Sequence, residues 1–278
     1  MVIDLHTHST ASDGTLSPAA LIAEARSAGL SVVALTDHDT TAGWDEAAAA
    51  LPGQLSLVRG AEISCTRGGI SLHLLAYLFD PSYAPLADRL SAVVASRETR
   101  AQRMVDLLAA DGHPVTWDQV RREAGGTVGR PHVAQALVGA GLVGSVEEAF
   151  TPDWIGPRGR YWAAKDEVDA LEAVALVREA GGVSVFAHPA ASARGRVVGD
   201  DVVEELAAAG LDGLEVEHAD HTPEQRAHLR ELAAAHGLLV TGSSDFHGSN
   251  KTTALGAHTT APAEYAELVG RATGVGVL

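Results

Sequence analysis

The 278-residue sequence has few aromatic residues, a single cysteine and no long apolar run. Aromatic residues make up only 4% of the chain, so a hydrophobic core must be built mainly from alanine, valine and leucine. Cys65 is the only cysteine, which excludes an intrachain disulfide and fits a reducing compartment. The N-terminus does not resemble a secretory signal peptide, and no apolar run is long enough to cross a bilayer. We therefore expect a cytoplasmic protein without a membrane segment.

Positive charge is scarce as well. The chain has 20 lysines and arginines against 36 acidic residues, a formal net charge of −16 at pH 7. Such a chain lacks the broad basic surface that binds duplex DNA or anionic membranes, and we expect neither as a partner. A phosphorylated substrate remains compatible with this charge, because bound metal ions can be the largest local charges in a site. The sequence leaves the oligomeric state open.

Seven short segments read as strands, and helical patterns separate most of them. The strands are predicted at residues 2–6, 31–36, 55–63, 70–78, 183–187, 213–217 and 238–242. Buried runs that alternate with helices are typical of a parallel sheet, so the order predicts a parallel α/β barrel.

One stretch interrupts this alternation. Residues 85–110 read as one long helix, and residues 115–160 are shorter, broken segments with several glycines and prolines. We interpret residues 98–165 as a helical insertion that caps the active site, and residues 1–97 and 166–278 as the barrel. The next helix is predicted at residues 166–180.

Histidines and acidic residues recur where the predicted strands end. His6 and His8 follow the first strand with i, i+2 spacing, so both side chains point the same way and can reach one metal ion. Asp245 and His247 repeat this spacing after the last strand. Each pair could instead be two hydrogen-bonded side chains beside a turn. In an α/β barrel, however, the carboxyl ends of the strands form the face that carries the active site.

Glu62 stands inside an apolar strand, where an unpaired carboxylate is costly to bury. We interpret it as a bridging ligand between two cations. The alternative is a structural ion pair with an arginine, of which Arg59 and Arg67 are the nearest in sequence.

Single histidines accompany three further strands. His38 lies between Asp37 and Asp39 after the second strand, and these aspartates are expected to orient the imidazole or to cap a loop. His73 lies within an apolar strand and His188 directly follows another. A lone histidine in such a place is usually a core residue, but here each joins a wider pattern.

Nine candidate ligands thus fall in or after six of the seven strands: His6, His8, Asp13, His38, Glu62, His73, His188, Asp245 and His247. Nine exceed the need of one tetrahedral zinc ion, so two or three metals are implied. Nitrogen and oxygen ligands without cysteine suit Mn²⁺, which we expect first, or Zn²⁺ or Fe²⁺. Of the remaining histidines, His218 and His221 flank the exit of a predicted strand and could touch a substrate, but we expect them on a surface loop.

With these residues in place, the sequence resembles the PHP (polymerase and histidinol phosphatase) family of metallophosphoesterases. The likeness covers residues 1 to about 250 and rests on residues 4–8, residues 36–39, Glu62, His73, residues 188–189 and residues 245–247. It implies a distorted seven-stranded (β/α)7 TIM-like barrel with a trinuclear centre. The ligand sets it implies are His6, His8, Glu62 and Asp245; Glu62, His73 and His188; and Asp13, His38 and His247.

Within this family, the chain is similar to the branch of nucleoside 3′,5′-bisphosphate phosphatases that includes ribonuclease AM. Asp13, where many members have histidine, and the run Val-Gly-Arg-Pro-His-Val-Ala at residues 128–134 carry this likeness. It implies that Arg130 and His132 face the metals and bind the substrate phosphate, which a planar guanidinium suits. The pattern also leads us to expect a glycine-arginine pair just after residue 189. Arg194, further along, is the expected substitute for that arginine.

The implied reaction is metal-assisted hydrolysis, in which a water of lowered pKa attacks phosphorus in line. Catalytic roles would fall to Asp13, His38, Arg130 and His132, with His132 as a proton donor and Arg194 as a further substrate contact. The expected substrate is a nucleoside 3′,5′-bisphosphate that loses its 3′-phosphate. Trimming of short RNA from the 5′ end is compatible with the same site.

Three alternatives remain at this point. One is another phosphomonoesterase, such as a histidinol phosphatase. Another is an amidohydrolase with the same His-x-His start, although binuclear versions often use a carboxylated barrel lysine. The only lysines here, Lys165 and Lys251, end no predicted strand. The third is a non-catalytic metal-binding module, which should have lost ligands.

Overall fold

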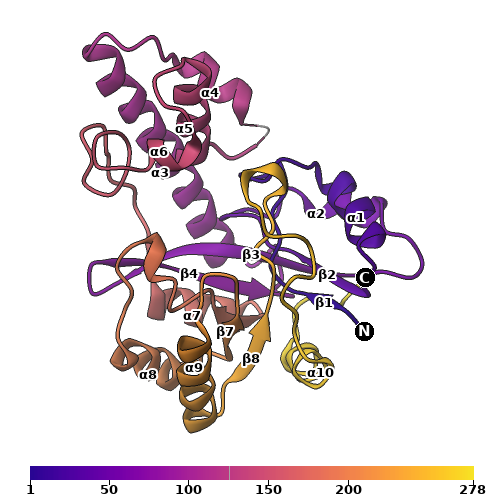
Figure 1. The fold of residues 1–278 in the computed structure, drawn as a ribbon. Helices are drawn as coiled ribbons and strands as arrows, with labels where there is room; N and C mark the ends of the chain where they lie inside the picture. The colour runs from indigo at the N-terminus through magenta and orange to yellow at the C-terminus, as the bar shows by residue number, and fades with distance from the viewer. Residues whose placement is uncertain (125) are drawn as a thin grey trace.

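A barrel-like sheet lies beneath a lobe of short helices in the computed structural model, which describes residues 1–124 and 126–278 (Figure 1). The strands are β1 (Ile3–Asp4), β2 (Val32–Leu35), β3 (Ser56–Arg67), β4 (Ile70–Tyr77), β5 (Val168–Asp169), β6 (Val183–Phe186), β7 (Gly213–Glu217) and β8 (Leu239–Gly242). The barrel helices are α1 (Pro18–Ser27), α2 (Trp44–Ala49), α7 (Ala170–Glu179), α8 (Asp200–Ala209), α9 (Pro223–His236) and α10 (Pro262–Arg271). The remaining helices are α3 (Ala84–Ala110), α4 (Trp117–Glu123), α5 (Arg130–Gly139) and α6 (Val146–Ala149), with short 3-10 turns η1 (Ser192–Arg194) and η2 (Gly248–Asn250).

The sheet follows the order β1-β2-β3-β4-β6-β7-β8, and the two-residue β5 pairs with β3. Its two ends approach each other just beyond β1 and β8, where Thr7 and Phe246 form a parallel bridge. The His8 backbone N–H donates to the Phe246 carbonyl at 2.9 Å. The sheet is therefore a nearly closed barrel, which confirms the predicted distorted seven-stranded barrel, with β5 as a small addition.

The predicted parallel barrel has one exception, the strand β4. This strand runs antiparallel to both of its neighbours, β3 and β6. The reason is local: Gly68 and Gly69 both have positive φ, 58° and 71°, which only glycine adopts without strain. Two such residues form a tight reversal, so β3 returns directly as β4 without a crossover helix.

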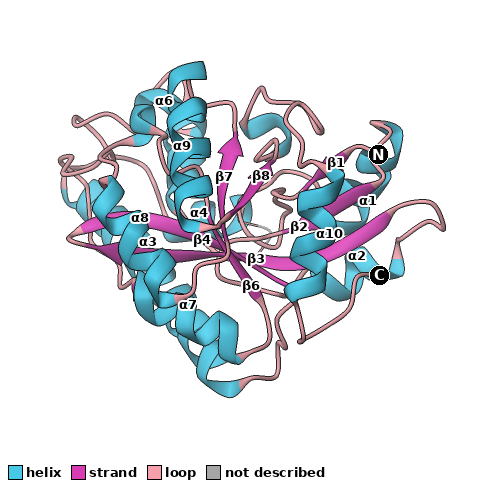
Figure 2. Cartoon of the chain, turned by 90° about the horizontal axis from the view of Figure 1, so that it is seen from below, coloured by secondary structure: helices cyan, strands magenta, loops and turns pink. Residues whose placement is uncertain are grey.

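Alternate residues of the strands serve two hydrophobic clusters. In β4, Leu75 and Tyr77 face the inner cluster, and Leu72, Leu74 and Ala76 face the layer of helices. This alternation is the two-residue period of a strand. The helices α7, α8 and α9 lie around the outside of the sheet, and α10 lies at the end opposite the insertion (Figure 2).

The 27-residue helix α3 links the barrel to the insertion. Its first turns contribute Leu86, Leu90 and Val93 to the barrel core, and its last turns contribute Met104 and Leu108 to a separate core. That second core extends to residue 163, so the insertion packs largely around itself. The division at residues 98 and 165 stays a prediction.

The helix predicted at residues 166–180 begins later, at Ala170. Val168 and Asp169 pair with β3 as β5, and the Asp169 carboxylate accepts a hydrogen bond from Leu171 N, which caps α7. Within the described residues, no helix has the length and apolar character needed to span a membrane.

Because β4 is part of the barrel core, we predict that shortening a buried side chain in it strongly lowers the free energy of unfolding. Leu74 is fully buried, so Leu74→Ala should lower the free energy of unfolding by about 2–5 kcal/mol, through lost burial and the cavity left behind. Leu107→Ala is the matched control, because Leu107 is 42% exposed on α3. Urea denaturation would compare both with the wild type. Equal effects of the two substitutions would contradict this description of the core.

Candidate metal centre and cleft

All nine candidate ligands meet at one end of the barrel. His6 and His8 follow β1, His38 follows β2, and Asp245 and His247 follow β8. Glu62 and His73 project from β3 and β4, His188 follows β6, and Asp13 lies in the loop before α1. Seven of the nine are buried, and His73 and His188 are partly buried. Their role as ligands stays a prediction, but the convergence that it requires is present.

The Glu62 carboxylate occupies the middle of this cluster. Its Oε2 lies 3.1–3.2 Å from the ring nitrogens of His6, His8 and His38. Its Oε1 lies 2.7 Å from His73 Nδ1 and 3.0 Å from His188 Nε2. Each oxygen therefore serves a different group of imidazoles, which is the geometry of a bridging ligand. Neither Arg59 nor Arg67 contacts it; Arg59 binds the Gly276 carbonyl, and Arg67 binds Asp169 and Glu205.

Two aspartates complete groups on either side of Glu62. Asp245 Oδ1 lies 3.4 Å from His6 Nε2 and 3.3 Å from His247 Nδ1. Asp13 lies 3.4 Å from His247 Nε2 and 3.7 Å from His38 Nε2. The resulting groups with mutually close ligand atoms are His8, Asp13, His38 and His247; His6, His8 and Asp245; and His38, Glu62 and His73. They resemble the three implied ligand sets with these differences: His8 and His38 each occur in two groups, Glu62 occurs in one group only, and His188 occurs in none.

The ring nitrogens of the cluster are placed to bind divalent cations, and two of them make no hydrogen bond within the described part of the protein. His38 Nδ1 and His73 Nδ1 are buried without a hydrogen-bond partner, although each lies near a Glu62 oxygen. The Nε2 atoms of His6 and His8 lie 3.0 Å apart. Buried polar atoms without partners are costly, so a cation between them would relieve this cost.

The protonation states favour metal binding. Burial alone would raise the Glu62 pKa, but His38, His73 and His6 outweigh it and hold that pKa well below its usual value. Burial, together with the charge of Arg194, lowers the pKa of His188 to about 3. Glu62 is thus an anionic carboxylate and His188 a neutral imidazole, which are the forms that bind metals. His6 differs: burial opposes its protonation, but Glu62, Asp245 and Glu215 raise its pKa.

Glu215 was not predicted from the sequence, yet it supports two of the candidate ligands. Its Oε1 lies 3.0 Å from His6 Nδ1, and its Oε2 accepts a hydrogen bond from the His188 backbone N–H at 2.7 Å. A carboxylate behind a ligating histidine fixes the ring and its tautomer. The signal was available, because Glu215 stands inside an apolar strand just as Glu62 does.

The aspartates beside His38 do not orient its ring as expected. Asp37 accepts hydrogen bonds from Ser9 N at 2.8 Å and from Ser12 Oγ at 2.6 Å. Asp39, at a φ of 57°, accepts from Ser64 N at 2.6 Å. Both carboxylates therefore hold the loops that carry the histidines. His188 and Asp245 also have positive φ, 33° and 51°, a strain that clusters at functional sites.

His218 and His221 were predicted on a surface loop, and this was wrong, because both are buried. His218 Nε2 lies 3.3 Å from Asp245 Oδ2, on the side of that carboxylate away from His6. His221 accepts a hydrogen bond from Ala190 N at 3.2 Å and shapes the loop after β6.

Arg194 is engaged by protein carboxylates. Its Nη2 donates to Asp245 Oδ2 at 2.7 Å and its Nε to Asp220 at 2.5 Å. Lys251 Nζ donates to the same Asp245 oxygen at 2.6 Å. These contacts hold Asp245 in place, while Arg194 also lines the cleft described below. Its substrate contact stays a prediction.

Arg130 and His132 lie in the first turn of α5. His132 Nδ1 accepts a hydrogen bond from Gly129 N at 2.9 Å, so the histidine closes the start of the helix. Burial lowers the pKa of His132. The Arg130 guanidinium lies 5.3 Å from the centre of the Phe150 ring, and it lines the cleft between the insertion and the barrel. The two residues thus start a helix, and Arg130 also lines the cleft; the substrate-binding role of both stays a prediction.

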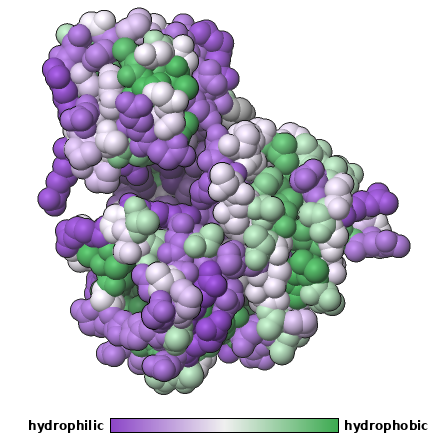
Figure 3. All heavy atoms as spheres, in the orientation of Figure 1, coloured by the Kyte–Doolittle hydropathy of each residue, from purple (hydrophilic) through white to green (hydrophobic). Residues whose placement is uncertain are grey.

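This cleft has a volume of about 830 Å³ and includes His73 and His188 on its wall. In Figure 3, hydrophilic residues border the hollow between the upper lobe and the body. Arg100, Arg130 and Lys165 line it from the insertion side. Burial and the charge of Arg97 lower the pKa of Lys165 to about 8. An acidic protein therefore has a local cluster of cations beside its candidate ligands.

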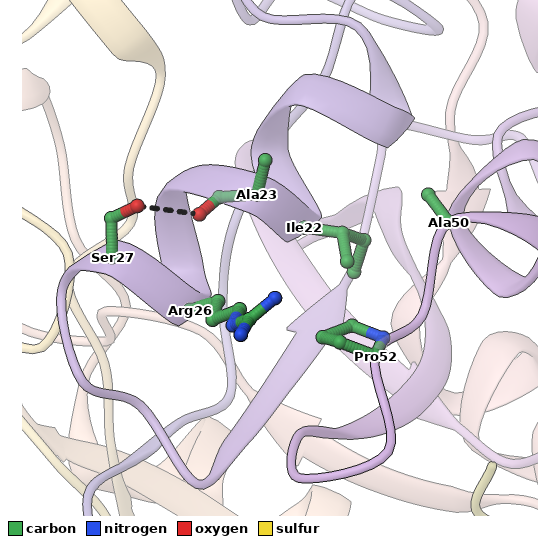
Figure 4. A pocket seen from close by; sticks show the side chains of 6 residues that line it. All are labelled: Ile22, Ala23, Arg26, Ser27, Ala50 and Pro52. Carbon is green, nitrogen blue, oxygen red and sulfur yellow. Dashed lines mark hydrogen bonds between the residues drawn. The ribbon is translucent and has the colours of Figure 1, made fainter.

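A second hollow, of about 370 Å³, lies beside α1 and α2 (Figure 4). Ile22, Ala23, Arg26, Ser27, Ala50 and Pro52 line it. The Ser27 hydroxyl donates to the Ala23 carbonyl at 3.0 Å within α1. With one arginine and neither histidine nor carboxylate, it offers no catalytic group.

Convergent histidines and carboxylates at the carboxyl end of an α/β barrel, beside a cationic cleft, define a metal-dependent hydrolase of phosphoric esters. Comparison with known proteins leads to the same class. The profile of the PHP domain matches residues 4–121, and the chain belongs to the PHP family.

Several relatives are similar over most of their length. A 5′-3′ exoribonuclease of Haemophilus influenzae is 36% identical, over 88% of this chain and 89% of its own. A 3′,5′-nucleoside bisphosphate phosphatase of Chromobacterium violaceum is 33% identical, over 88% and 87%. The crystal structure of a putative metal-dependent phosphoesterase from Bifidobacterium adolescentis has a TM-score of 0.92 and 40% identity, over 98% and 96%. The resemblance to this branch of the family is thereby confirmed.

The central position of Glu62 predicts that its charge is needed to hold metal. Glu62→Gln keeps the size of the side chain but removes the charge that both groups of imidazoles share, so bound metal should fall by at least one ion per chain. Plasma mass spectrometry after gel filtration would measure this. Glu98→Gln, at an exposed position of α3, is the control. Full metal content in Glu62→Gln would rule out a bridging role.

The ion pair between Arg97 of α3 and Asp39 leads us to predict that the stability of the fold depends on pH. Its Nε donates to buried Asp39 at 2.5 Å. Burial would raise the Asp39 pKa, but Arg97 lowers it to about 2, below the usual 3.8. The pair therefore stabilises the fold above about pH 4, and this contribution is lost as the pH falls through 2. Arg97→Met should cost about 3–5 kcal/mol at pH 7, because Asp39 is left charged and unpaired.

Urea unfolding of chelated protein at pH 7 and pH 4 would test this, because protonation of Asp39 in the variant should shrink the loss at the lower pH. Arg89→Met on the same helix is the control, since its pair with Glu172 is exposed and should matter by less than about 1 kcal/mol. A loss of the same size at both pH values would refute the assignment.

Proposed function

We propose that this protein removes the 3′-phosphate from nucleoside 3′,5′-bisphosphates and leaves nucleoside 5′-monophosphates. The observation that carries the proposal is the position of the nine-residue cluster, because two of its members, His73 and His188, line one cleft together with Arg100, Arg130 and Lys165. A bisphosphate has two anionic groups, and this cleft offers one place for the phosphate that reacts and cations for the other. The name of the Chromobacterium violaceum relative supports this substrate.

The proposed centre holds two or three divalent ions, with Mn²⁺ first and Zn²⁺ or Fe²⁺ as alternatives. Glu62 with His73 and His188 would hold one ion; Glu62 with His6, His8 and Asp245 another; and Asp13, His38 and His247 the third. The nitrogen and oxygen donors, with Cys65 buried elsewhere, suit these metals. When bound, the metals supply a water of lowered pKa and neutralise charge on the phosphoryl oxygens.

The protein's own groups would then position and protonate the substrate. Arg130 would bind a phosphate through its planar guanidinium, and Arg100 and Lys165 would add positive charge in the cleft. As the bond from phosphorus to the 3′ oxygen breaks and a bond to the water oxygen forms, His132 would give a proton to the 3′ oxygen. The nearby phosphate would raise the pKa of His132, which burial lowers.

Trimming of short RNA from the 5′ end is a second candidate activity of the same site. The exoribonuclease name of the Haemophilus influenzae relative favours it. The net charge of −16 disfavours a strong hold on long nucleic acids, so we propose short RNA ends only. A cytoplasmic location belongs to this proposal as well and stays a prediction.

The earlier alternatives fit less well. Neither lysine of this chain lies on a strand, as a carboxylated bridging lysine would; Lys165 precedes β5 and Lys251 follows η2. A degenerate, non-catalytic module would have lost members of the cluster, but all nine are present. A histidinol phosphatase would not need the cations that the insertion adds to the cleft.

Phosphate release from adenosine 3′,5′-bisphosphate tests the proposal. With Mn²⁺, we expect phosphate and adenosine 5′-monophosphate in equal amounts, and a chelator should abolish both. The Asp13→Ala, His38→Ala double variant should lose at least about 100-fold in kcat/KM, because it removes two candidate ligands near the reacting phosphate.

The control is a second histidine-aspartate pair on the surface, His228 and Asp200, 2.9 Å apart. Its double alanine variant should keep full activity. If protein loaded with two or more metals releases no phosphate from the bisphosphate, the proposed substrate is wrong, and histidinol phosphate would be tested next.

A further inference from the structure

Two large apolar side chains stand exposed on the wall of the cleft. Trp162, in the insertion, and Val197, in the barrel loop between β6 and α8, are each 41% exposed. Among the described residues, the other large exposed apolar side chains lie at the termini or on the outside of α3: Met1, Val2, Leu107 and Leu278. Trp162 and Val197 are therefore the large apolar side chains that the described part of the chain exposes within the cleft.

The backbone around Trp162 is held firmly. The preceding Tyr161 is buried; its hydroxyl donates to Asp111 at 2.8 Å, and its N–H donates to the Trp154 carbonyl at 3.0 Å. The N–H of Trp162 itself donates to the Gly159 carbonyl at 3.0 Å. The indole is thus presented to the cleft by a fixed turn, at little further cost in conformational entropy.

Two arginines lie beside these apolar groups. Arg158, on the insertion, and Arg196, next to Val197, line the same cleft and are exposed. In the described part of the chain, neither forms an ion pair with a carboxylate, whereas Arg194 forms two. In a protein with a net charge of −16, unpaired arginines in the same cleft as an exposed indole are a local match for a ligand that is both aromatic and anionic.

We propose that Trp162 is the surface on which the nucleobase of the substrate stacks, with Val197 packing against the base from the barrel side. This inference rests on the proposed function and extends it. One cleft joins His73 and His188 to Trp162, so a nucleotide can place its reacting phosphate at the metal ligands and its base at the indole. Arg158 and Arg196 would face phosphates of the same ligand or of a following nucleotide.

Stacking also predicts a pattern of specificity. Every base has an aromatic face, so a platform without hydrogen-bonding partners accepts all four bases. The enzyme should accordingly discriminate between nucleotides and phosphoesters that lack a base. It should discriminate little between adenosine and uridine 3′,5′-bisphosphates.

The test compares two substitutions and two substrates. Trp162→Ala should raise KM for adenosine 3′,5′-bisphosphate roughly tenfold, the effect of losing one base stack, with kcat within about twofold. Trp162→Phe keeps an aromatic face and should stay close to the wild type. For ribose 3,5-bisphosphate, which lacks a base, Trp162→Ala should leave KM unchanged. An unchanged KM for the adenosine substrate, or an equal rise for both substrates, would overturn the inference.

A binding measurement separates this inference from the proposed function. Adenosine 5′-monophosphate, added with Mn²⁺, should quench the tryptophan fluorescence of the wild type, and Trp162→Phe should lose that quench. If the wild type hydrolyses no bisphosphate but the quench occurs and depends on Trp162, the proposed function fails and base stacking stands. If the quench is absent, or is the same in Trp162→Phe, base stacking fails even in an active enzyme.

Discussion

A single buried carboxylate organises this molecule. Glu62 contacts five imidazoles that come from four different parts of the sheet. A charge so deep in a barrel is tolerated only where opposite charge or hydrogen-bond donors surround it. The strands must therefore end at the same level, and the loops after them must turn inward. Many of the hydrogen bonds at this end of the barrel hold these loops in that position.

Further acidic residues at this face form hydrogen bonds that support the candidate ligands. Asp37 and Asp39 hold the loops after β1 and β2, and Glu215 holds the His6 ring and the His188 backbone. Arg97 extends this support from the barrel to α3, because it pairs with Asp39 while its helix continues into the insertion. The position of the cleft is thus coupled to the position of the ligands.

The candidate ligands could be predicted from the sequence because strands of a barrel end on a common face. A histidine after one strand and a carboxylate after another then meet, whatever their separation along the chain, as His6 and Asp245 do. The antiparallel β4 was missed because an apolar run has no visible direction, although Gly68 and Gly69 marked the reversal. Glu215 was missed although, like Glu62, it is a carboxylate within an apolar strand. His218 was misplaced because its contact with Asp245 depends on which side chain lies beside it in space, and spacing along the chain does not give this.

The insertion gives the site its chemical selectivity in this account. The barrel supplies metal ligands, and the insertion supplies Arg100, Arg130, Lys165 and Trp162 on the facing wall. The residues of the insertion would determine which ester binds, and the barrel would hold the metal ions needed for its hydrolysis. The two walls belong to separate hydrophobic cores, and α3 contributes to both.

The central claim is that Glu62 bridges metal ions at the carboxyl end of the barrel. Crystals of protein loaded with Mn²⁺, measured with X-rays at the manganese absorption edge, test it most directly. We predict at least two anomalous peaks within the nine-residue cluster, with the two Glu62 oxygens bound to different ions. A single peak, or peaks that Glu62 does not contact, would contradict the account.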